Sequence, residues 1–422
     1  MKLKKQIAAL LCTALLGTML TGCGTQAQAL TSDAEYITVS DDAIWQEHTN
    51  ALADFSYDLL RYTAAMTNED VLVSPLSAWF ALSMTGQWAN GETKNEFAWF
   101  SKRLDDEGQA KLAAWLMGYL DKTYGENNEN IQVGVANSVW VDDALTVEND
   151  FVDTVKAYYR SQIIAQDLQA SGAVQNVNQW ISDATNERIQ DMLERIDPSA
   201  VMILINALTL DAKWQTEFDI ANTREGVFYL PDGTELQKDF MHRRITNGTY
   251  LHWDGGEGVV LPYRGENMAM IALLPNEGST CADIIDNLSS AWMYDLQENH
   301  TQCIVQLSMP KFKMESSLNL NEVCQKMGLE LAFDARNADF SGIGKAESGQ
   351  NIFIGRVLQD CMLEVGEEGT KAAAATVVEM RVGSARPNPS KIVNLTLDRP
   401  FVYLIVDTET QIPLFTGIYQ GE

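Results

Sequence analysis

Residues 367–390 read EEGTKAAAATVVEMRVGSARPNPS, and this stretch near the C-terminal end carries the most information about the fold. The four alanines of residues 372–375 favour a helix, because alanine loses the least conformational entropy there. A glycine and a threonine precede them, Val377 and Val378 follow, and the stretch closes on Pro-Asn-Pro. A short helix over TKAAAA is therefore one interpretation of the segment. The residues on either side of it favour a second interpretation.

Residues 370–381 also alternate like a β-strand. One face would carry Thr370, Ala372, Ala374, Thr376, Val378 and Met380, and the other would carry Lys371, Ala373, Ala375, Val377, Glu379 and Arg381. Every charge falls on the second face, and the first face is small or apolar throughout. The pattern favours a strand buried on one side, whose small residues would let it enter between existing strands.

The composition limits the classes of protein to which this chain can belong. The 422 residues suffice for one large domain or two to three ordinary ones, and 46% hydrophobic residues with ten tryptophans can fill a sizeable core. The formal net charge of −28 argues against nucleic acid, other polyanions and anionic membrane surfaces as partners. We expect no nucleic-acid binding.

The N-terminal residues have the features of a bacterial lipoprotein signal. Lys2, Lys4 and Lys5 precede an apolar core, which ends in Leu-Thr-Gly-Cys at residues 20–23. We interpret residues 1–22 as a lipoprotein signal peptide, Cys23 as the lipid attachment site and residues 23–42 as a lipid-anchored tether. A plain signal peptide with an incidental cysteine is the alternative. The expected location is the cell surface or the outer face of the cell membrane, with release outside the cell as a further outcome.

Known catalytic and metal-binding patterns are missing from the sequence. Four histidines occur, none at metal-ligand spacing, and there is no C-x-x-C, G-x-S-x-G, P-loop or G-x-G-x-x-G motif. Cys281, Cys303, Cys324 and Cys361 are widely scattered, which favours buried free thiols over a disulfide framework. We expect no catalytic residues, no metal and no cofactor; a hydrolase with a nonstandard site is kept as an alternative.

Periodicity predicts a helix that opens at Ser74-Pro75 and runs to Gly91, and further helices over residues 107–124 and 174–196. Residues 131–141 alternate as a strand, and residues 201–214 form an apolar run typical of a strand buried on both faces. The chain is strand-dense beyond residue 225, and no linker divides it. One α+β domain over residues 43–422 is the economical interpretation.

Five stretches occur in the order found in one protein family. They are VLVSPLSAWFALSMTGQWANGET, TNERIQDML with LINALTLDAKWQTEFD, LSMPKFKMESSLNLNEVCQKMGLELAFDARNADFSGI, GEEGTKAAAA, and RPFVYLIVDTETQIPLFTGIY. Together they resemble the serpins, the family of serine protease inhibitors, over about residues 43–421. The resemblance implies several mixed and antiparallel sheets surrounded by about eight to nine helices, with residues 367–390 as an exposed reactive-centre loop.

The resemblance also implies a mechanism. A serine protease cleaves the loop and becomes acylated, and the freed loop then inserts as a central strand that carries the protease across the molecule. The expected loop hinge consists of Glu367, Glu368, Gly369, Thr370, Ala372, Ala373, Ala374 and Ala375. The part of the hinge from Thr370 to Ala375 contains no proline and points no charge inward, so an inhibitory serpin is expected. A non-inhibitory serpin-like surface binding protein, an adhesin or ligand carrier, is the alternative.

Two departures from the family pattern matter. Gln359 stands where a histidine is usual beneath the inserting strand, and an amide can still donate and accept hydrogen bonds. The loop is several residues longer than is typical, with the excess after the cleavage region, which leaves the scissile bond open.

Family spacing places the cut at Val382–Gly383 or Gly383–Ser384, with an elastase-like or subtilisin-like target. A cut at Arg381–Val382 by a trypsin-like enzyme is the second choice. Met380 and Ala385 depart further from the expected length, and the bond after Arg386 leads into a proline that hinders attack.

The expected partners are serine proteases, bound covalently, and a membrane through the N-terminal lipid only. Lys111 and Lys122 are the only cations of the helix over residues 107–124, so heparin is not expected to bind. We expect a monomer.

Overall fold

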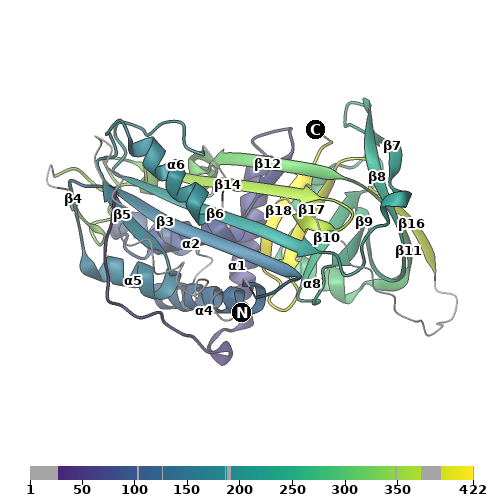
Figure 1. Cartoon of the computed structure of the whole chain (residues 1–422), viewed down its shortest axis with the longest axis horizontal. Coiled ribbons are helices and arrows are strands. Elements are labelled where there is room, and N and C mark those ends of the chain that lie inside the picture. Colours follow the sequence, from purple (N-terminus) through teal and green to yellow (C-terminus); the bar gives the residue numbers. More distant parts are fainter. Residues whose placement is uncertain are drawn as a thin grey trace, which may run out of the picture.

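The structure is a computed structural model that describes residues 27–101, 104–125, 127–185, 187, 192–346, 349–371 and 391–421. Within these ranges it has nine α-helices and three β-sheets (Figure 1). The helices are α1 (Gln46–Ala64), α2 (Pro75–Gly86), α3 (Gly91–Phe100), α4 (Asp106–Tyr124), α5 (Asn149–Tyr159), α6 (Ala173–Ala184), α7 (Cys281–Ile285), α8 (Ser290–Glu298) and α9 (Asn321–Lys326). The expected single α+β domain is confirmed.

A seven-stranded sheet forms the front of the molecule in Figure 1. Its strands, in spatial order, are β1 (Gln28–Ala29), β5 (Gln162–Gln166), β3 (Ile131–Asp142), β6 (Met202–Lys213), β15 (Gly369–Lys371), β14 (Arg356–Val365) and β12 (Phe312–Asn319). The predicted strands over residues 131–141 and 201–214 are β3 and β6, which pair antiparallel along nearly their whole length. The apolar run of β6 is buried because helices cover both faces of the sheet at this point.

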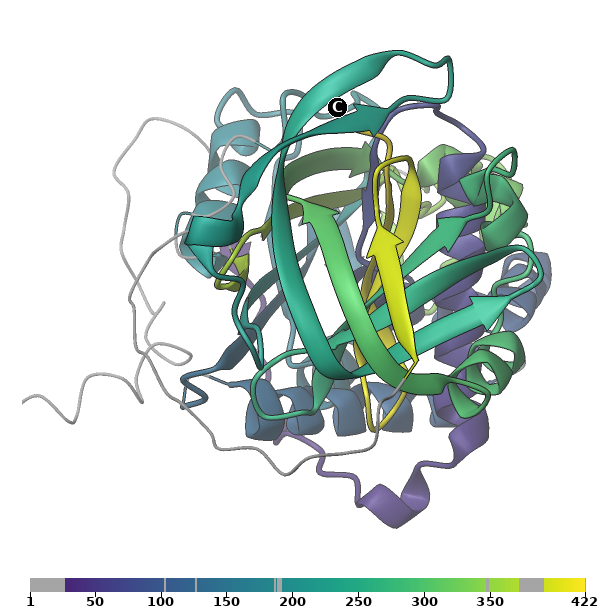
Figure 2. The same cartoon turned by 90° about the vertical axis from the view of Figure 1, so that its right-hand side faces the viewer.

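A second sheet packs behind the first and curves around the other end of the molecule, where Figure 2 shows it nearest the viewer. Its strands follow the order β16 (Ile392–Thr396), β11 (Thr301–Pro310), β8 (Glu235–Trp253), β9 (Gly256–Pro262), β10 (Met268–Pro275), β17 (Phe401–Asp407), β18 (Pro413–Tyr419) and β2 (Val71–Val73), and β7 (Arg224–Tyr229) pairs with β8. A two-stranded sheet joins β4 (Leu145–Val147) to β13 (Gly344–Ala346). The apolar core lies between the two large sheets and the helices.

Helix α2 lies beneath β3, β6 and β14 and is buried along its whole length. It begins as predicted, with Ser74 before the helix and Pro75 at its first position, where a missing N–H costs nothing. The helix ends at Gly86, not at Gly91 as predicted. Gly91 has a φ of +53° and begins α3, so the chain turns between two helices where periodicity suggested one.

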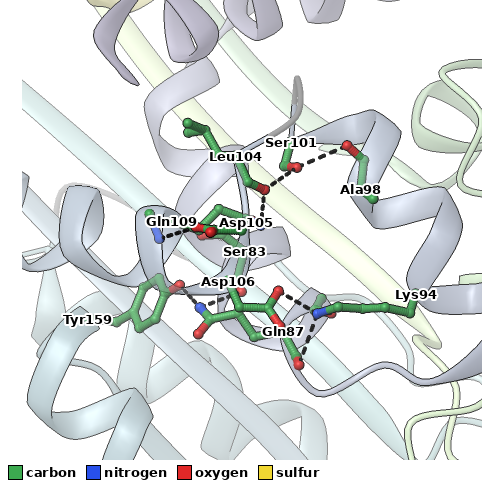
Figure 3. Close-up of polar contacts among 12 residues, drawn as sticks. Ser83, Gln87, Lys94, Ala98, Ser101, Leu104, Asp105, Asp106, Gln109 and Tyr159 are labelled. Carbon is green, nitrogen blue, oxygen red and sulfur yellow. Dashed lines mark hydrogen bonds and ion pairs between the residues drawn. The ribbon is translucent and has the colours of Figure 1, made fainter. Parts of the chain in front are cut away.

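Polar contacts fix this turn at the end of α2 (Figure 3). The Lys94 ammonium donates to the carbonyl oxygens of Gly86 and Gln87, both at 3.1 Å, and lies 2.5 Å from a carboxylate oxygen of Asp106 on α4. The Gln87 side chain reaches the hydroxyl of Tyr159 on α5. The end of the buried helix is therefore held by its three helical neighbours, and its position beneath the sheet is well defined.

Helix α6 covers the outer face of the seven-stranded sheet (Figure 1). Val177 and Ile181 on its inner side pack with Ile203 and Ile205 of β6 and Leu358 of β14 in a separate apolar cluster. The helix predicted to reach residue 196 ends at Ala184, and residues 192–196 are not helical. The apolar residues after the helix still contribute to the cluster through Leu193, which explains why their spacing suggested a longer helix.

The described part of the expected tether lies along the edge of the domain. Strand β1 pairs antiparallel with β5 at the free edge of the seven-stranded sheet. Further on, the Ile37 amide donates to the Ala157 carbonyl at 2.9 Å, and the Trp115 indole N–H donates to an Asp41 carboxylate oxygen at 2.8 Å. Residues 27–42 thus contact α4, α5 and β5 before α1 begins.

The four cysteines beyond Cys23 are free and buried, as the sequence suggested. Burial raises the pKa of Cys281 and of Cys324 to about 12, so both are neutral thiols. No helix in the described part of the chain is both long and apolar enough to cross a membrane. Among the same residues, no group of three or more His, Cys, Asp or Glu side chains could hold a metal ion.

Candidate functional site

The expected loop hinge begins inside the seven-stranded sheet. Strand β15 pairs antiparallel with both of its neighbours: Thr370 lies opposite Val365 of β14 and opposite Ala212 of β6. Thr370 is completely buried (0% exposed). Next to this wedge, β6 and β14 pair directly and in parallel, from Ile203 with Arg356 to residues 207 and 360. The two central strands are therefore paired with each other near their start, and the hinge lies between them at their other end.

Gly369 marks the point where the hinge enters the sheet. A Cβ atom at this position would lie 2.1 Å from the Ala212 carbonyl oxygen and 2.7 Å from the Lys213 Cα. These distances are far below van der Waals contact, so only glycine allows the backbones to approach this closely. The glycine in EEGT is thus required by packing in the intact protein.

Two stacked aromatic rings hold the hinge from below. Trp214, at the end of β6, stacks on Tyr263 with ring centroids 4.5 Å apart, and both are fully buried. The hydroxyls of Tyr263 and Thr370 lie 2.6 Å apart in a hydrogen bond, and the Trp214 indole N–H donates to the Gly366 carbonyl at 2.8 Å. Burial raises the pKa of Tyr263, so its hydroxyl keeps its proton and can donate to Thr370.

Glu367 secures the hinge at the end of the sheet. The Lys311 ammonium lies 3.0 Å from one carboxylate oxygen, and the Thr223 hydroxyl donates to the other at 2.9 Å. The Phe218 amide donates to the Glu367 carbonyl at 2.9 Å. Burial alone would raise the pKa of Glu367, but the contacts with Lys311 and Thr223 outweigh it and hold this pKa below its ordinary value.

A row of buried amides crosses the sheet beyond the wedge. Asn137 of β3, Asn206 of β6 and Gln359 of β14 are cross-strand partners, and all three are buried. The Asn206 amide donates to Asn137. Among the described residues, Asn206 Oδ1 and Asn137 Nδ2 have no hydrogen-bond partner. The middle of the sheet therefore carries polar groups where β6 and β14 meet, with spare hydrogen-bonding capacity.

Gln359 connects this row to the buried helix. Its side-chain oxygen accepts from the Ser74 amide at 2.9 Å, and its side-chain nitrogen donates to the Ser74 carbonyl at 2.7 Å. The Ser74 hydroxyl in turn donates to the Leu414 carbonyl at 3.0 Å. Gln359 thus both donates and accepts at this position, as expected of an amide.

The structure brings together only part of the expected site. Glu367, Glu368, Gly369 and Thr370 form the described hinge. The remaining hinge alanines, the candidate scissile-bond residues and the lipid site lie outside the described residues: Ala372, Ala373, Ala374, Ala375, Arg381, Val382, Gly383, Ser384 and Cys23. The assignment of the cleaved bond and of the lipid anchor stays a prediction.

Sequence reasoning missed the groups that hold the hinge. Trp214 and Lys311 belong to two of the recognised motifs, but no pattern assigned them to the loop. Tyr263 and Thr223 lie in stretches without a motif, more than a hundred residues before the hinge. Only the tertiary pairing of β6, β14 and β15 reveals these contacts.

Comparisons with known proteins agree with this geometry. The family model described as "Serpin (serine protease inhibitor)" matches residues 50–420. An uncharacterised serpin-like protein of Thermococcus kodakarensis is 30% identical over 373 residues, which cover 87% of this chain and 84% of the relative. Human alpha-1-antichymotrypsin is 28% identical, over 86% of this chain and 85% of its own length. The chain belongs to the serpin family.

Two solved structures of one serpin allow the conformation of this chain to be compared with a native and a latent state. The crystal structure of tengpin, a thermophilic serpin, in its native state superposes with a TM-score of 0.84 at 32% identity, over 94% of this chain and all of that one. The latent state of tengpin gives a TM-score of 0.74, over 91% of this chain and 99% of that one. The described chain is thus more similar to the native form, in agreement with the direct pairing of β6 and β14.

We predict that Tyr263→Phe loosens the hinge. The change keeps the ring stack but leaves the buried Thr370 hydroxyl without its partner, which costs about 1–2 kcal/mol. Hydrogen exchange of a peptide that spans residues 366–371 should become about five- to thirtyfold faster. Tyr250→Phe, which removes a hydroxyl bonded to Glu257 on the other sheet, is the matched control. Unchanged exchange in Tyr263→Phe would contradict the role of this bond.

A second prediction concerns pH. Because the folded-state pKa of Glu367 is lowered, its carboxylate stabilises the fold above the unfolded pKa of about 4.3 and loses this effect as pH falls through the folded pKa. The melting temperature of the wild type should exceed that of Glu367→Gln at pH 7. The difference should shrink as the pH falls below about 4.3 and the carboxylate is protonated. Glu364→Gln, on the exposed side of β14, is the control. A difference that persists undiminished at about pH 3 would refute the assignment.

Proposed function

We propose that this serpin is a suicide-type inhibitor of serine proteases, which traps the acyl-enzyme by inserting its cleaved loop between β6 and β14. Serpins generally inhibit serine proteases and are generally not enzymes. The observation that supports inhibition in this chain is the hinge itself, which already occupies the end of the central sheet with Thr370 buried.

The loop sequence suits insertion. Residues 370–376 contain no proline, and their inward positions carry only threonine and alanine. A strand inserted here would gain a ladder of hydrogen bonds on both sides, each worth about 1 kcal/mol net, before packing is counted. We infer from this gain that the loop-cleaved protein is more stable than the intact protein.

The target class is inferred from residues near the expected cut. Val382 would fill a small apolar pocket, as in elastase-like and subtilisin-like enzymes, and Arg381 would suit a trypsin-like enzyme. Family spacing from Glu367 favours Val382–Gly383 or Gly383–Ser384, so an elastase-like or subtilisin-like target is proposed first.

The proposal also includes a location at the cell surface and inhibition without a glycosaminoglycan cofactor. The N-terminal signal with Cys23 supports export and a lipid anchor at the cell surface. Helix α4 carries acidic residues besides its two cations, and Lys111 forms a 2.6 Å ion pair with Glu107. This surface supports inhibition that glycosaminoglycans do not accelerate.

The test is covalent trapping. Incubation with elastase-like and subtilisin-like proteases should give a complex that survives SDS, whereas Thr370→Arg should be cleaved without complex. The variant places a long cation on the inward face of β15, where an unpaired buried charge is costly. Lys371→Arg, which keeps a cation one residue further on, is the matched control. No complex with any protease class would favour a serpin-like binding protein, and full yield from Thr370→Arg would refute the insertion argument.

The cleaved bond is predicted separately. Mass spectrometry of the small C-terminal fragment from the reaction should give a start at Gly383 or Ser384. A start at Val382 would overturn the choice in favour of a trypsin-like target. A fragment that begins at Pro387 would contradict the expectation that proline blocks the bond after Arg386.

A further inference from the structure

A buried carboxylate lies at the point where the two central strands stop pairing with each other. Asp360 of β14 and Ala207 of β6 form the last recorded pair between these strands on the side of the hinge. Asp360 is only 7% exposed. Figure 1 shows the two strands side by side in the seven-stranded sheet, with β12 next to β14 on its other side. Neither the hinge contacts nor the contacts of Gln359 use this carboxylate.

Asp360 lies on the outer face of the sheet, next to apolar side chains. Side chains alternate along a strand, so Asp360 shares a face with Leu358 and lies on the other face from Gln359, which reaches the Ser74 backbone. Leu358 and Ala207 both belong to the apolar cluster beneath α6. The carboxylate therefore lies at the border of an apolar cluster, where its charge is poorly solvated.

The neighbouring side chains compensate this charge only in part. Asp360 Oδ1 is buried, and no described residue forms a hydrogen bond with it. Ser317 is the cross-strand partner of Asp360 on β12, and its hydroxyl favours the charged form. Burial favours the neutral form and outweighs Ser317, so the pKa of Asp360 is raised above its ordinary value.

The other charged side chains on this face lie at least two strand positions from Asp360 or from its cross-strand partners. They are Arg356 and Glu364 on β14, Lys313 and Glu315 on β12, and Asp211 on β6. Lys313 and Glu315 form an ion pair with each other, and the Arg356 guanidinium donates to the Arg195 carbonyl at 3.0 Å. Helix α6 contributes the apolar side chains of Val177 and Ile181 to the adjoining cluster. Within the described chain, Asp360 therefore titrates without an ion-pair partner.

The position of Asp360 couples its charge to the pairing of the two strands. An unpartnered charge is costly at a buried site, and separation of β6 from β14 would return the carboxylate to water. The neutral carboxyl group carries a smaller cost in the paired sheet. A strand that enters from the hinge meets the pair of Ala207 with Asp360 before the pairs that run on to Ile203 with Arg356. The charge of one side chain thus acts on the first pair that must separate.

We propose that Asp360 is a pH-dependent latch of the seven-stranded sheet: its neutral form keeps β6 and β14 paired, and its charged form weakens the pair at which the sheet would open. The latch needs no residue of the loop, since Asp360, Ser317 and Ala207 all belong to the described sheet. Its effect on protease trapping rests on the proposed function. In acid the sheet opens less readily, and at neutral to alkaline pH it opens more readily.

The direction of the pH dependence follows from the raised pKa. Below the unfolded pKa of about 3.9 the group is neutral in both the folded and the unfolded state, and the closed sheet has its full stability. This stability is lost as the pH rises through the folded pKa of Asp360. The dependence is opposite in sign to that of Glu367, whose pKa is lowered, so a variant of each residue separates the two effects.

The variant Asp360→Asn tests the latch, because an amide of the same shape does not ionise. At about pH 8 the intact variant should melt about 1–4 °C above the wild type, and the two should converge as the pH falls to about 4. Hydrogen exchange of a peptide over residues 356–361 should be about five- to thirtyfold slower in the variant at about pH 8 and equal at about pH 4. Glu364→Gln, an exposed position on the same face, is the matched control and should behave as the wild type.

Ser317→Ala tests the direction independently. It removes the hydroxyl that favours the charged form, so the pH at which the wild type loses protection should rise by about 0.5–1 unit. The same change in the Asp360→Asn background should leave the pH profile unchanged. A profile that Ser317→Ala does not move would overturn the latch, as would a wild type and an Asp360→Asn variant that melt and exchange alike at about pH 8.

Protease trapping separates the latch from the proposed function. At about pH 8, Asp360→Asn should raise the number of inhibitor molecules consumed per protease trapped by roughly a factor of two or more, because its sheet opens more slowly. At about pH 4.5 the variant and the wild type should consume similar numbers. A wild type that traps no protease, but whose pH-dependent exchange is abolished by Asp360→Asn, would support the latch and reject the inhibitory function.

Discussion

The pairing of β6 with β14 is the interaction on which the rest of the structure depends. The two strands run in parallel and share direct pairs only from residues 203 and 356 to 207 and 360, and beyond these the hinge keeps them apart. A parallel pair is slightly weaker per residue than an antiparallel one, and two antiparallel ladders could replace it. Under the proposed mechanism, insertion of the loop would replace this one parallel pairing by two antiparallel ones.

Specific polar contacts lie at both ends of the stretch in which β6 and β14 are not paired with each other. At the hinge, Glu367 with Lys311 and Thr370 with Tyr263 hold the start of the loop in place. At the far end, Gln359 holds β14 to Ser74 at the start of α2 through both its donor and its acceptor. Because an amide does not titrate, this second contact is the same across the range of about pH 5–8 in which a histidine changes charge.

The sequence predicts those elements of the structure that depend on a local pattern of residues. Apolar periodicity predicts β6 and the start of α2, and strict alternation predicts that the loop can be a strand, which β15 shows for its first residues. The helix predicted from the sequence is longer than α6, because Leu193 contributes to the same apolar cluster after the helix has ended. The sequence gives no sign of Tyr263 or of the strand β1, since both act through partners that are distant in sequence.

The length of the loop follows from the same geometry. If an inserted loop kept the pairing of Thr370 with Val365, residues 370–379 would extend along all ten residues of β14, and the sheet would then constrain the number of residues between the hinge and the cleaved bond. A shorter stretch would leave the Arg356 end of β14 unpaired, and a longer one would leave slack between the inserted strand and the trapped enzyme. In the proposed mechanism the residues after the cut stay outside the sheet, and they have to reach β16, which begins at Ile392. If the additional residues of this loop follow the cut, as the resemblance implies, they add length outside the inserted strand and leave the proposed insertion unchanged.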